Sequence, residues 1–333
     1  MKVGLRSHNG AEERLLFAQQ IKAQGASIWA KAVPEYETRC YLTADDVRSM
    51  RARFDRYNLE LTGIGLGGEC LKNQLLGLPG RDQEIENVCR TIRAIGEAYA
   101  DGAPSPVVII DQRTTYWAPK GPMWHPGYER QPVGPGGTML TTFDTSRMVG
   151  ELDDQPAGQV SNAEVWERIR YFYERIVPVA EQAKVRLATH PDDPPMACYR
   201  GVEQALIGFE GFKKFIDLVP SPYNGLLLCL GCMQEAGEVV PEVIRYFGER
   251  KKIFYVHFRN VTGSVPKYTE TFPDEGDGDM VANLKALKEV GYEGYLVPDH
   301  HFGVDADDDE YPLISRAWQV GYIRGLLQAV GAK

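Results

Sequence analysis

Short apolar runs alternate with longer amphipathic stretches along the whole chain. Nearly continuous apolar runs separated by helical patterns are typical of parallel strands covered by helices. We expect eight such strands, at Val3–Leu5, Ser27–Lys31, Leu59–Gly65, Val107–Asp111, Val185–His190, Gly225–Cys229, Ile253–Phe258 and Gly294–Pro298. The amphipathic stretches predict helices at Ala11–Ala23, Ala44–Arg56, Asp82–Tyr99, Asn162–Ala183, Phe209–Val219, Pro241–Arg250, Met280–Val290 and Tyr311–Ala329. Eight strand–helix units favour an α/β fold, a single closed (β/α)8 TIM barrel.

One segment, Gln112–Gln159, interrupts this alternation after the fourth strand. It holds thirteen Gly and Pro residues and several aromatic residues, and it has no clear period. A loop of this length in a compact domain is usually functional or disordered, and its aromatic content argues against disorder. We therefore predict one domain over residues 1–333, in which residues 112–160 form a lid or an interface arm. A second polar insertion, Asn260–Asp279, follows the seventh strand.

Composition and charge narrow the function classes. The chain has 333 residues, is 43% hydrophobic and 25% charged, and carries a net charge of −9. These values indicate a globular protein with a large core, and the acidic balance argues against a nucleic-acid partner. No run of 18 apolar residues predicts a membrane span. Of the six Cys residues only Cys229 and Cys232 lie close in sequence, so we expect no disulfide framework and a cytoplasmic location.

Four successive predicted strands each end in a residue that can bind a metal: His190, Cys229, His257 and Asp299. In such barrels catalytic residues project from the carboxyl ends of the strands. Two imidazoles, a thiolate and a carboxylate suit Zn, Fe or Mn better than Mg or Ca. Each residue alone has an ordinary explanation, as a buried thiol, a hydrogen-bonded imidazole or a turn cap. Their equivalent places in consecutive units favour a single metal site.

Other residues near these strand ends have open roles. Asp192 and Asp193 either accept a hydrogen bond from the His190 imidazole or serve as turn residues. His8 ends the first strand and could face the pocket, and His125 lies in the long segment. A structural role is the simpler interpretation for both histidines.

The residues around the four candidate ligands resemble the mannonate dehydratase family. The resemblance covers roughly the C-terminal half and is carried by Val177–Pro195 with its His-Pro-Asp-Asp-Pro-Pro run, by Ser221–Gly231, by Val256–Val261 and by Pro298–His300. It implies a xylose-isomerase-like TIM barrel that converts D-mannonate to 2-keto-3-deoxy-D-gluconate and water. It also implies a divalent metal, Mn²⁺ first, with Fe²⁺ or another transition metal as alternatives.

The resemblance also assigns roles to individual residues. The metal ligands of the family fall on the four positions already identified, and its catalytic histidine falls on His300. Its catalytic tyrosine falls on Tyr311, with Tyr322 as the alternative. The first-strand segment Gly4–Gly10 replaces the Arg-Trp-Tyr-Gly of the family, and His300-His301-Phe302 replaces its His-Gly-Arg. These departures concern the choice of substrate more than the reaction class.

The implied chemistry needs a proton acceptor, a proton donor and groups that hold the sugar acid. We expect His300 and Tyr311 to share the proton transfers, with their order left open. Arg259 and Arg113 are candidates for the carboxylate or the outer hydroxyls, because a guanidinium fits a carboxylate. Asn260 is a candidate for a hydroxyl. The alternatives are plain ion pairs for the two arginines and a turn-starting role for Asn260.

Two other function classes remain at this stage. One is a metal-dependent sugar isomerase or epimerase on the same barrel, against which the Cys229 ligand argues. The other is a non-catalytic sugar-acid binder, against which the retention of all four ligands with His300 argues. In each case we expect a small-molecule sugar-acid partner, no nucleic-acid or membrane partner, and a homo-oligomer.

Overall fold

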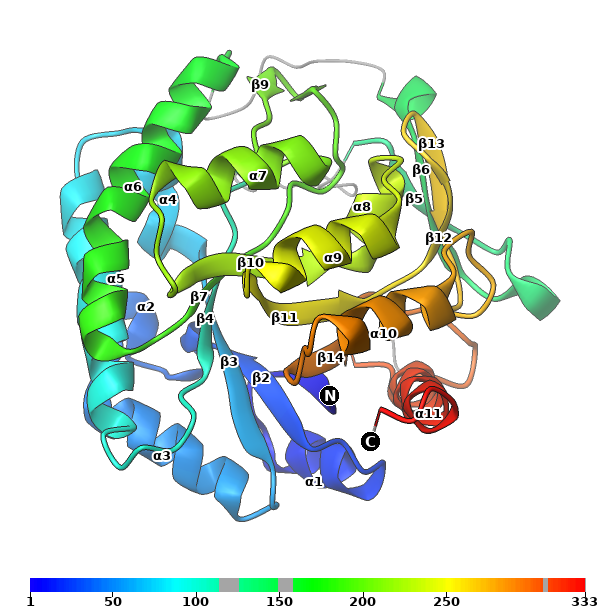
Figure 1. Ribbon diagram of the computed structural model, residues 1–333, viewed down its shortest axis with the longest axis horizontal. Helices are drawn as coiled ribbons and strands as arrows, with labels where there is room; N and C mark the ends of the chain where they lie inside the picture. Colours follow the sequence, from blue (N-terminus) through cyan, green and yellow to red (C-terminus); the bar gives the residue numbers. More distant parts are fainter. Residues whose placement is uncertain (114–125, 149–157, 308–310, 333) are drawn as a thin grey trace.

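The predicted barrel is present in the computed structural model, which describes residues 1–113, 126–148, 158–307 and 311–332 (Figure 1). Eight parallel strands close in the order β1-β14-β11-β10-β7-β4-β3-β2. They are β1 (Lys2–His8), β2 (Gly25–Trp29), β3 (Glu60–Leu66), β4 (Val107–Ile110), β7 (Leu187–Thr189), β10 (Asn224–Cys229), β11 (Ile253–Phe258) and β14 (Tyr295–Pro298). Each overlaps one predicted strand, so the α/β TIM-barrel prediction is confirmed.

The eight predicted helices are also present and cover the outside of the barrel (Figure 1). They are α1 (Glu12–Gln20), α3 (Ala44–Asp55), α5 (Arg81–Ala98), α6 (Asn162–Ala183), α7 (Gly208–Leu218), α9 (Val240–Glu249), α10 (Met280–Glu289) and α11 (Leu313–Ala329). Helices α3 and α6 begin at capping boxes, in which the side chains of Thr43 and Ser161 accept from the third residue of the helix. The short helices α2 (Tyr36–Arg39), α4 (Lys72–Leu76) and α8 (Leu230–Glu235) were not predicted, because they are too brief to show a helical period.

The barrel interior explains why the strands read as unbroken apolar runs. Every residue of β10 and β11 is buried, since one face meets the helices and the other fills the barrel. At Gly225 of β10 there is no room for a side chain. A Cβ there would lie 2.5 Å from the Lys252 carbonyl oxygen and 2.7 Å from the Phe254 ring. The close contact between β10 and β11 therefore requires a glycine.

A second sheet stands beside the barrel and was not predicted. Its four antiparallel strands run in the order β12-β13-β6-β5, visible at the right of Figure 1. They are β5 (Tyr128–Gln131), β6 (Leu140–Asp144), β12 (Val261–Ser264) and β13 (Lys267–Glu270). The two insertions thus form one unit, which we call the insertion sheet. Phe143 and Tyr268 pair across it with their rings stacked 5.0 Å apart. Of the aromatic residues expected in the long segment, Tyr116, Trp117 and Trp124 lie outside the described residues.

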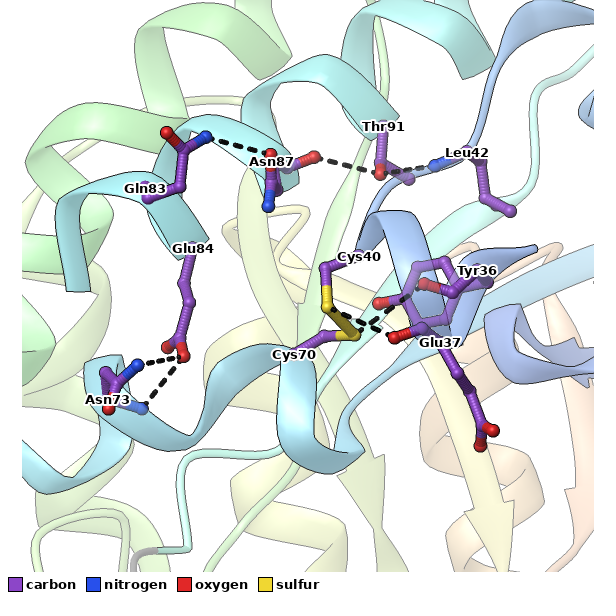
Figure 2. Close-up of a disulfide and its surroundings, with 10 residues drawn as sticks. All are labelled: Tyr36, Glu37, Cys40, Leu42, Cys70, Asn73, Gln83, Glu84, Asn87 and Thr91. Atoms are coloured by element: carbon purple, nitrogen blue, oxygen red, sulfur yellow. Dashed lines mark hydrogen bonds between the residues drawn. A yellow bond between two sulfur atoms is a disulfide. The ribbon is translucent and has the colours of Figure 1, made fainter. Parts of the chain in front are cut away.

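One disulfide departs from the sequence-based expectation. Cys40 and Cys70 are bonded, which ties the segment after β2 to the segment after β3 (Figure 2). The bond could not be foreseen because 30 residues separate the two cysteines, and only the fold brings them together. The other four cysteines are free thiols. Among the described helices, none combines the length and the apolar character that crossing a membrane requires.

Candidate active site

The four predicted metal ligands meet at the carboxyl ends of β7, β10, β11 and β14, which are neighbours in the barrel. One ligand atom from each of His190, Cys229, His257 and Asp299 lies within 4.8 Å of all the others. Parallel register produces this convergence, since Cys229 lies opposite His257 and the next strand ends just before Asp299. We call this group the metal cluster.

The polar atoms of the cluster fit a bound cation. The Nδ1 of His190 donates to the Pro191 carbonyl at 2.7 Å, which leaves Nε2 as a ligand. The Nδ1 of His257 is buried without a hydrogen-bond partner in the described part of the chain and lies 3.3 Å from Asp299 Oδ2. A cation shared between that nitrogen and that oxygen would satisfy both. The residues present therefore fit a divalent transition metal.

The charge state of Cys229 supports the same conclusion. Burial opposes ionisation of this thiol, but a hydrogen bond from Cys232, the Arg259 charge and hydrogen bonds from the two imidazoles outweigh burial. Together they hold the pKa of Cys229 well below its ordinary value. A thiolate is the form that binds a metal.

His300 stands beside the cluster and faces a cavity. Its Nδ1 lies 2.7 Å from Glu270 Oε1, and its Nε2 lies 3.5 Å from Asp299 Oδ2. Burial alone would lower the pKa of His300, but the Glu270 and Asp299 carboxylates outweigh burial and raise it to about 9. Asp299 is also paired with Arg6. Glu270 was not predicted as a site residue, because it comes from the second insertion and not from the end of a barrel strand.

The cavity occupies the barrel mouth and has a volume of about 840 Å³. His190, His257 and Asp299 of the metal cluster line it together with His300, and Trp29 of β2 lies on its wall. The insertion sheet supplies another wall through Tyr128, Arg130 and Glu270. The long segment thus contributes directly to the site through its described residues.

Two predicted substrate-binding residues, Arg259 and Asn260, are buried and are not among the residues that line this cavity. Arg259 is 3% exposed and pairs with Glu235 and Glu270, each at 2.8 Å, and with Asp193 at 3.2 Å. Asn260 accepts from the backbone N–H groups of Val261 and Gly278 and donates to the carbonyl oxygens of Pro273 and Gly278. Arg259 therefore neutralises buried carboxylates, and Asn260 fastens the second insertion.

Of the other two predicted site residues, Arg113 lines the cavity and Tyr311 is not among its lining residues. Arg113 lines the cavity and grips the Asp111 carboxylate through Nε and one terminal nitrogen. Tyr311 is 6% exposed and is not part of the cavity lining, and its hydroxyl donates to the Arg6 carbonyl at 3.0 Å. The Tyr311 ring lies 5.9 Å from the ring of His8, which does line the cavity. The alternative, Tyr322, stacks on Trp318 on the outside of the barrel.

The two aspartates after His190 have hydrogen-bond and ion-pair partners other than its imidazole. Asp192 accepts from the backbone N–H groups of Ala205 and Leu206, so it shapes the loop after β7. Asp193 faces Arg259 and the Tyr128 hydroxyl. His8 does line the cavity, and His125 lies outside the described residues.

Comparison with known proteins agrees with this geometry. The D-mannonate dehydratase family model matches residues 147–333. A mannonate dehydratase of Thermotoga neapolitana is 32% identical over 280 residues, 77% of each chain. The crystal structure of mannonate dehydratase from Streptococcus suis serotype 2 superposes with a TM-score of 0.84 at 27% identity, covering 99% of this chain and 93% of that one.

More distant structures share the fold alone. D-psicose 3-epimerase from Clostridium cellulolyticum H10 superposes with a TM-score of 0.64 at 14% identity, covering 98% of this chain and 99% of that one. The metal cluster, the barrel and the extent of the closer matches lead to one conclusion: the chain belongs to the D-mannonate dehydratase family, whose members are hydro-lyases.

Proposed function

We propose that the protein removes water from a sugar acid, D-mannonate first, to give 2-keto-3-deoxy-D-gluconate. The observation that carries this proposal is the metal cluster with the His300–Glu270 pair beside it at the mouth of a cavity. Dehydration requires removal of the proton next to a carboxylate and loss of the hydroxyl on the following carbon. Both steps need charge stabilisation and proton transfer at one place, and this arrangement offers both.

His190, Cys229, His257 and Asp299 would hold Mn²⁺, with Fe²⁺ or another transition metal as alternatives. When bound, the divalent cation supplies positive charge that stabilises the charge developing next to the substrate carboxylate.

His300 exchanges a proton with the substrate through Nε2 in this proposal. Glu270 accepts from Nδ1 and so fixes the orientation of the ring, while Arg259, which lies 2.8 Å from the same nitrogen, pairs with Glu270. A positioned proton-transfer group contributes roughly 10²–10⁴-fold in rate. We assign Tyr311 a positioning role, because its hydroxyl holds the backbone of Arg6.

Arg113 and Asp111 bind the hydroxyl groups of the sugar acid. Their ion pair presents donors and acceptors together without a net charge, which suits hydroxyls better than a second anion. Residues 112–160 act as a lid that keeps bulk water from the reacting atoms, since the described part of this segment already forms a cavity wall. Asn260 acts indirectly, by holding the second insertion in place.

A panel of aldonates and free sugars tests this function, with Mn²⁺, Fe²⁺ and Zn²⁺ each supplied. We expect a 2-keto acid, detected with semicarbazide, from D-mannonate and not from free sugars. Interconversion of free sugars without a keto acid would instead indicate an isomerase or epimerase. Binding of aldonates without turnover under every metal condition would indicate a sugar-acid binder.

We also propose a homo-oligomeric enzyme in the cytoplasm. The outer strands of the insertion sheet, β5 and β12, offer edges at which a second subunit could pair or pack. Light scattering on the purified protein measures the subunit number, and a monomeric mass at micromolar concentration would reject this part of the proposal.

A further inference from the structure

Four basic residues gather at the barrel mouth near the end of β1, the strand that neighbours β14 and pairs with Asp299 through Arg6. They are Arg6 and His8 of β1, His301 after β14, and Arg316 of α11, and we call them the β1 corner. Arg6, His8 and His301 line the cavity, whereas Arg316 lies behind them and is 2% exposed. None of these residues holds a place in the metal cluster or in the proton transfer described above.

Arg316 fixes the hydrogen-bonding state of His8. A terminal nitrogen of Arg316 lies 3.4 Å from His8 Nε2. Because a guanidinium can only donate, Nε2 accepts, and the proton of the neutral imidazole is on Nδ1. That N–H has no hydrogen-bond partner in the described part of the chain, and neither has the imidazole of His301. Two imidazoles at the cavity surface are thus available to a ligand.

The backbone of β1 supports a role for His8 beyond packing. His8 has a φ of 64°, in the left-handed region that a residue with a side chain seldom adopts. The pairing of β1 with β2 shifts register between Arg6 and His8. An irregularity at the end of a barrel strand often turns a side chain toward a functional site. Here the irregularity lies at His8, whose side chain lines the cavity.

Of the two arginines in the β1 corner, Arg6 pairs with Asp299, whereas Arg316 has no carboxylate partner among the described residues. Burial, with Arg6 and Arg316 close by, lowers the pKa of His8 to about 3. Burial also lowers the pKa of Arg316 to about 10, and its buried Nε has no hydrogen-bond partner among the described residues. Arg113 and Arg259, unlike Arg316, each pair with carboxylates. The two histidines are therefore neutral donors, and the positive charges of Arg6 and Arg316 beside them would stabilise a bound anion.

We propose that the β1 corner receives the substrate carboxylate, through N–H donors of Arg6, His8 and His301, with Arg316 as the residue that positions His8. This inference rests on the proposed function for the identity of the ligand. Arg6 would then bridge the carboxylate and Asp299, so the acid end of the substrate lies at the edge of the metal cluster. The hydroxyl chain extends from there toward Asp111 and Arg113, across the cavity.

Calorimetric titration of the Mn²⁺-loaded protein tests the inference by comparing D-mannonate with D-mannitol, which has the hydroxyls but no carboxylate. The wild type should prefer D-mannonate. His8→Leu and His301→Leu should each reduce the ratio of the two affinities by about tenfold, as expected for one hydrogen bond to a charged group. His8→Asn, whose amide N–H replaces Nδ1–H, should restore most of the ratio. The control Arg113→Gln should weaken both ligands equally and leave the ratio unchanged.

Arg316→Met separates positioning from direct contact. It should lower the ratio of the two affinities as His8→Leu does. The double variant that carries both Arg316→Met and His8→Leu should show no lower a ratio than either single variant, because both changes remove the same donor. An unchanged ratio in the His8 and His301 variants, or a reduced ratio in Arg113→Gln, would overturn the assignment of the carboxylate. Failure of the proposed function looks different: the ratio would respond as expected while no aldonate is dehydrated.

Discussion

At the scale of single residues, Cys229 is the most informative metal ligand, because a thiolate separates this site from all-oxygen sites. Cys229→Ser should reduce bound metal by well over tenfold, since a serine hydroxyl does not ionise near neutral pH. Elemental analysis after dialysis against buffered Mn²⁺ measures the loss. Cys198→Ser, the same change at an exposed free thiol, serves as control and should keep a full complement of metal. Equal metal content in the two variants would contradict the assignment of Cys229.

His300 separates proton transfer from metal binding at the same scale. His300→Asn removes the proton-exchanging nitrogen while the four ligands stay in place, so metal content should be unchanged. Turnover should fall about 10²–10⁴-fold, the usual contribution of a positioned acid or base. Steady-state rates on the best aldonate, with metal content measured on the same sample, test this. A variant with near-normal turnover would exclude His300 from the chemistry.

At the scale of elements, sequence patterns predicted the strands and helices that short segments form by themselves. They missed the sheet that forms between segments far apart in the chain. The eight barrel strands were predictable because each is a continuous apolar run, and the metal ligands because each ends such a run. The insertion sheet was not, because β6 pairs with β13 more than a hundred residues further along the chain. Glu270 and Tyr128 were missed for that reason. Neither stands at the end of a recognisable strand.

The second insertion provides a test of how such an element is held. Asn260→Ala removes the acceptor for two backbone N–H groups and the donor for two carbonyl oxygens in a buried place. The free energy of unfolding should fall by about 2–4 kcal/mol, because several buried polar groups lose their partners. Urea denaturation measures the change. Thr262→Ala, an exposed position in the same insertion, should stay within about 0.5 kcal/mol of the wild type. A raised KM in Asn260→Ala with unaltered stability would instead indicate direct contact with substrate.

At the scale of the whole molecule, the two halves of the barrel contribute differently. The strands β7, β10, β11 and β14 carry the metal cluster, whereas β1 carries Arg6 and His8 of the β1 corner and the end of β4 carries the Asp111–Arg113 pair. The metal ligands could be predicted from the sequence, since few residue types can bind a transition metal. Substrate contacts can be made by many residue types, so Arg259 and Arg113 could not be told apart until their partners were visible.

The Cys40–Cys70 disulfide lies in the half of the barrel that does not hold the metal, and this allows stability and function to be tested separately. Closing a segment with a sequence separation of 30 residues is worth about 3–4 kcal/mol when the stabilisation is ascribed to the entropy of the unfolded chain. Reduction, or Cys40→Ser, should therefore lower the melting temperature while bound metal stays unchanged. Reductant should not change the melting temperature of Cys40→Ser any further. If reductant left the melting temperature of the wild type unchanged, the disulfide would add no stability. In a reducing cytoplasm both thiols would be free, so the melting temperature in fresh lysate should match that of the reduced protein.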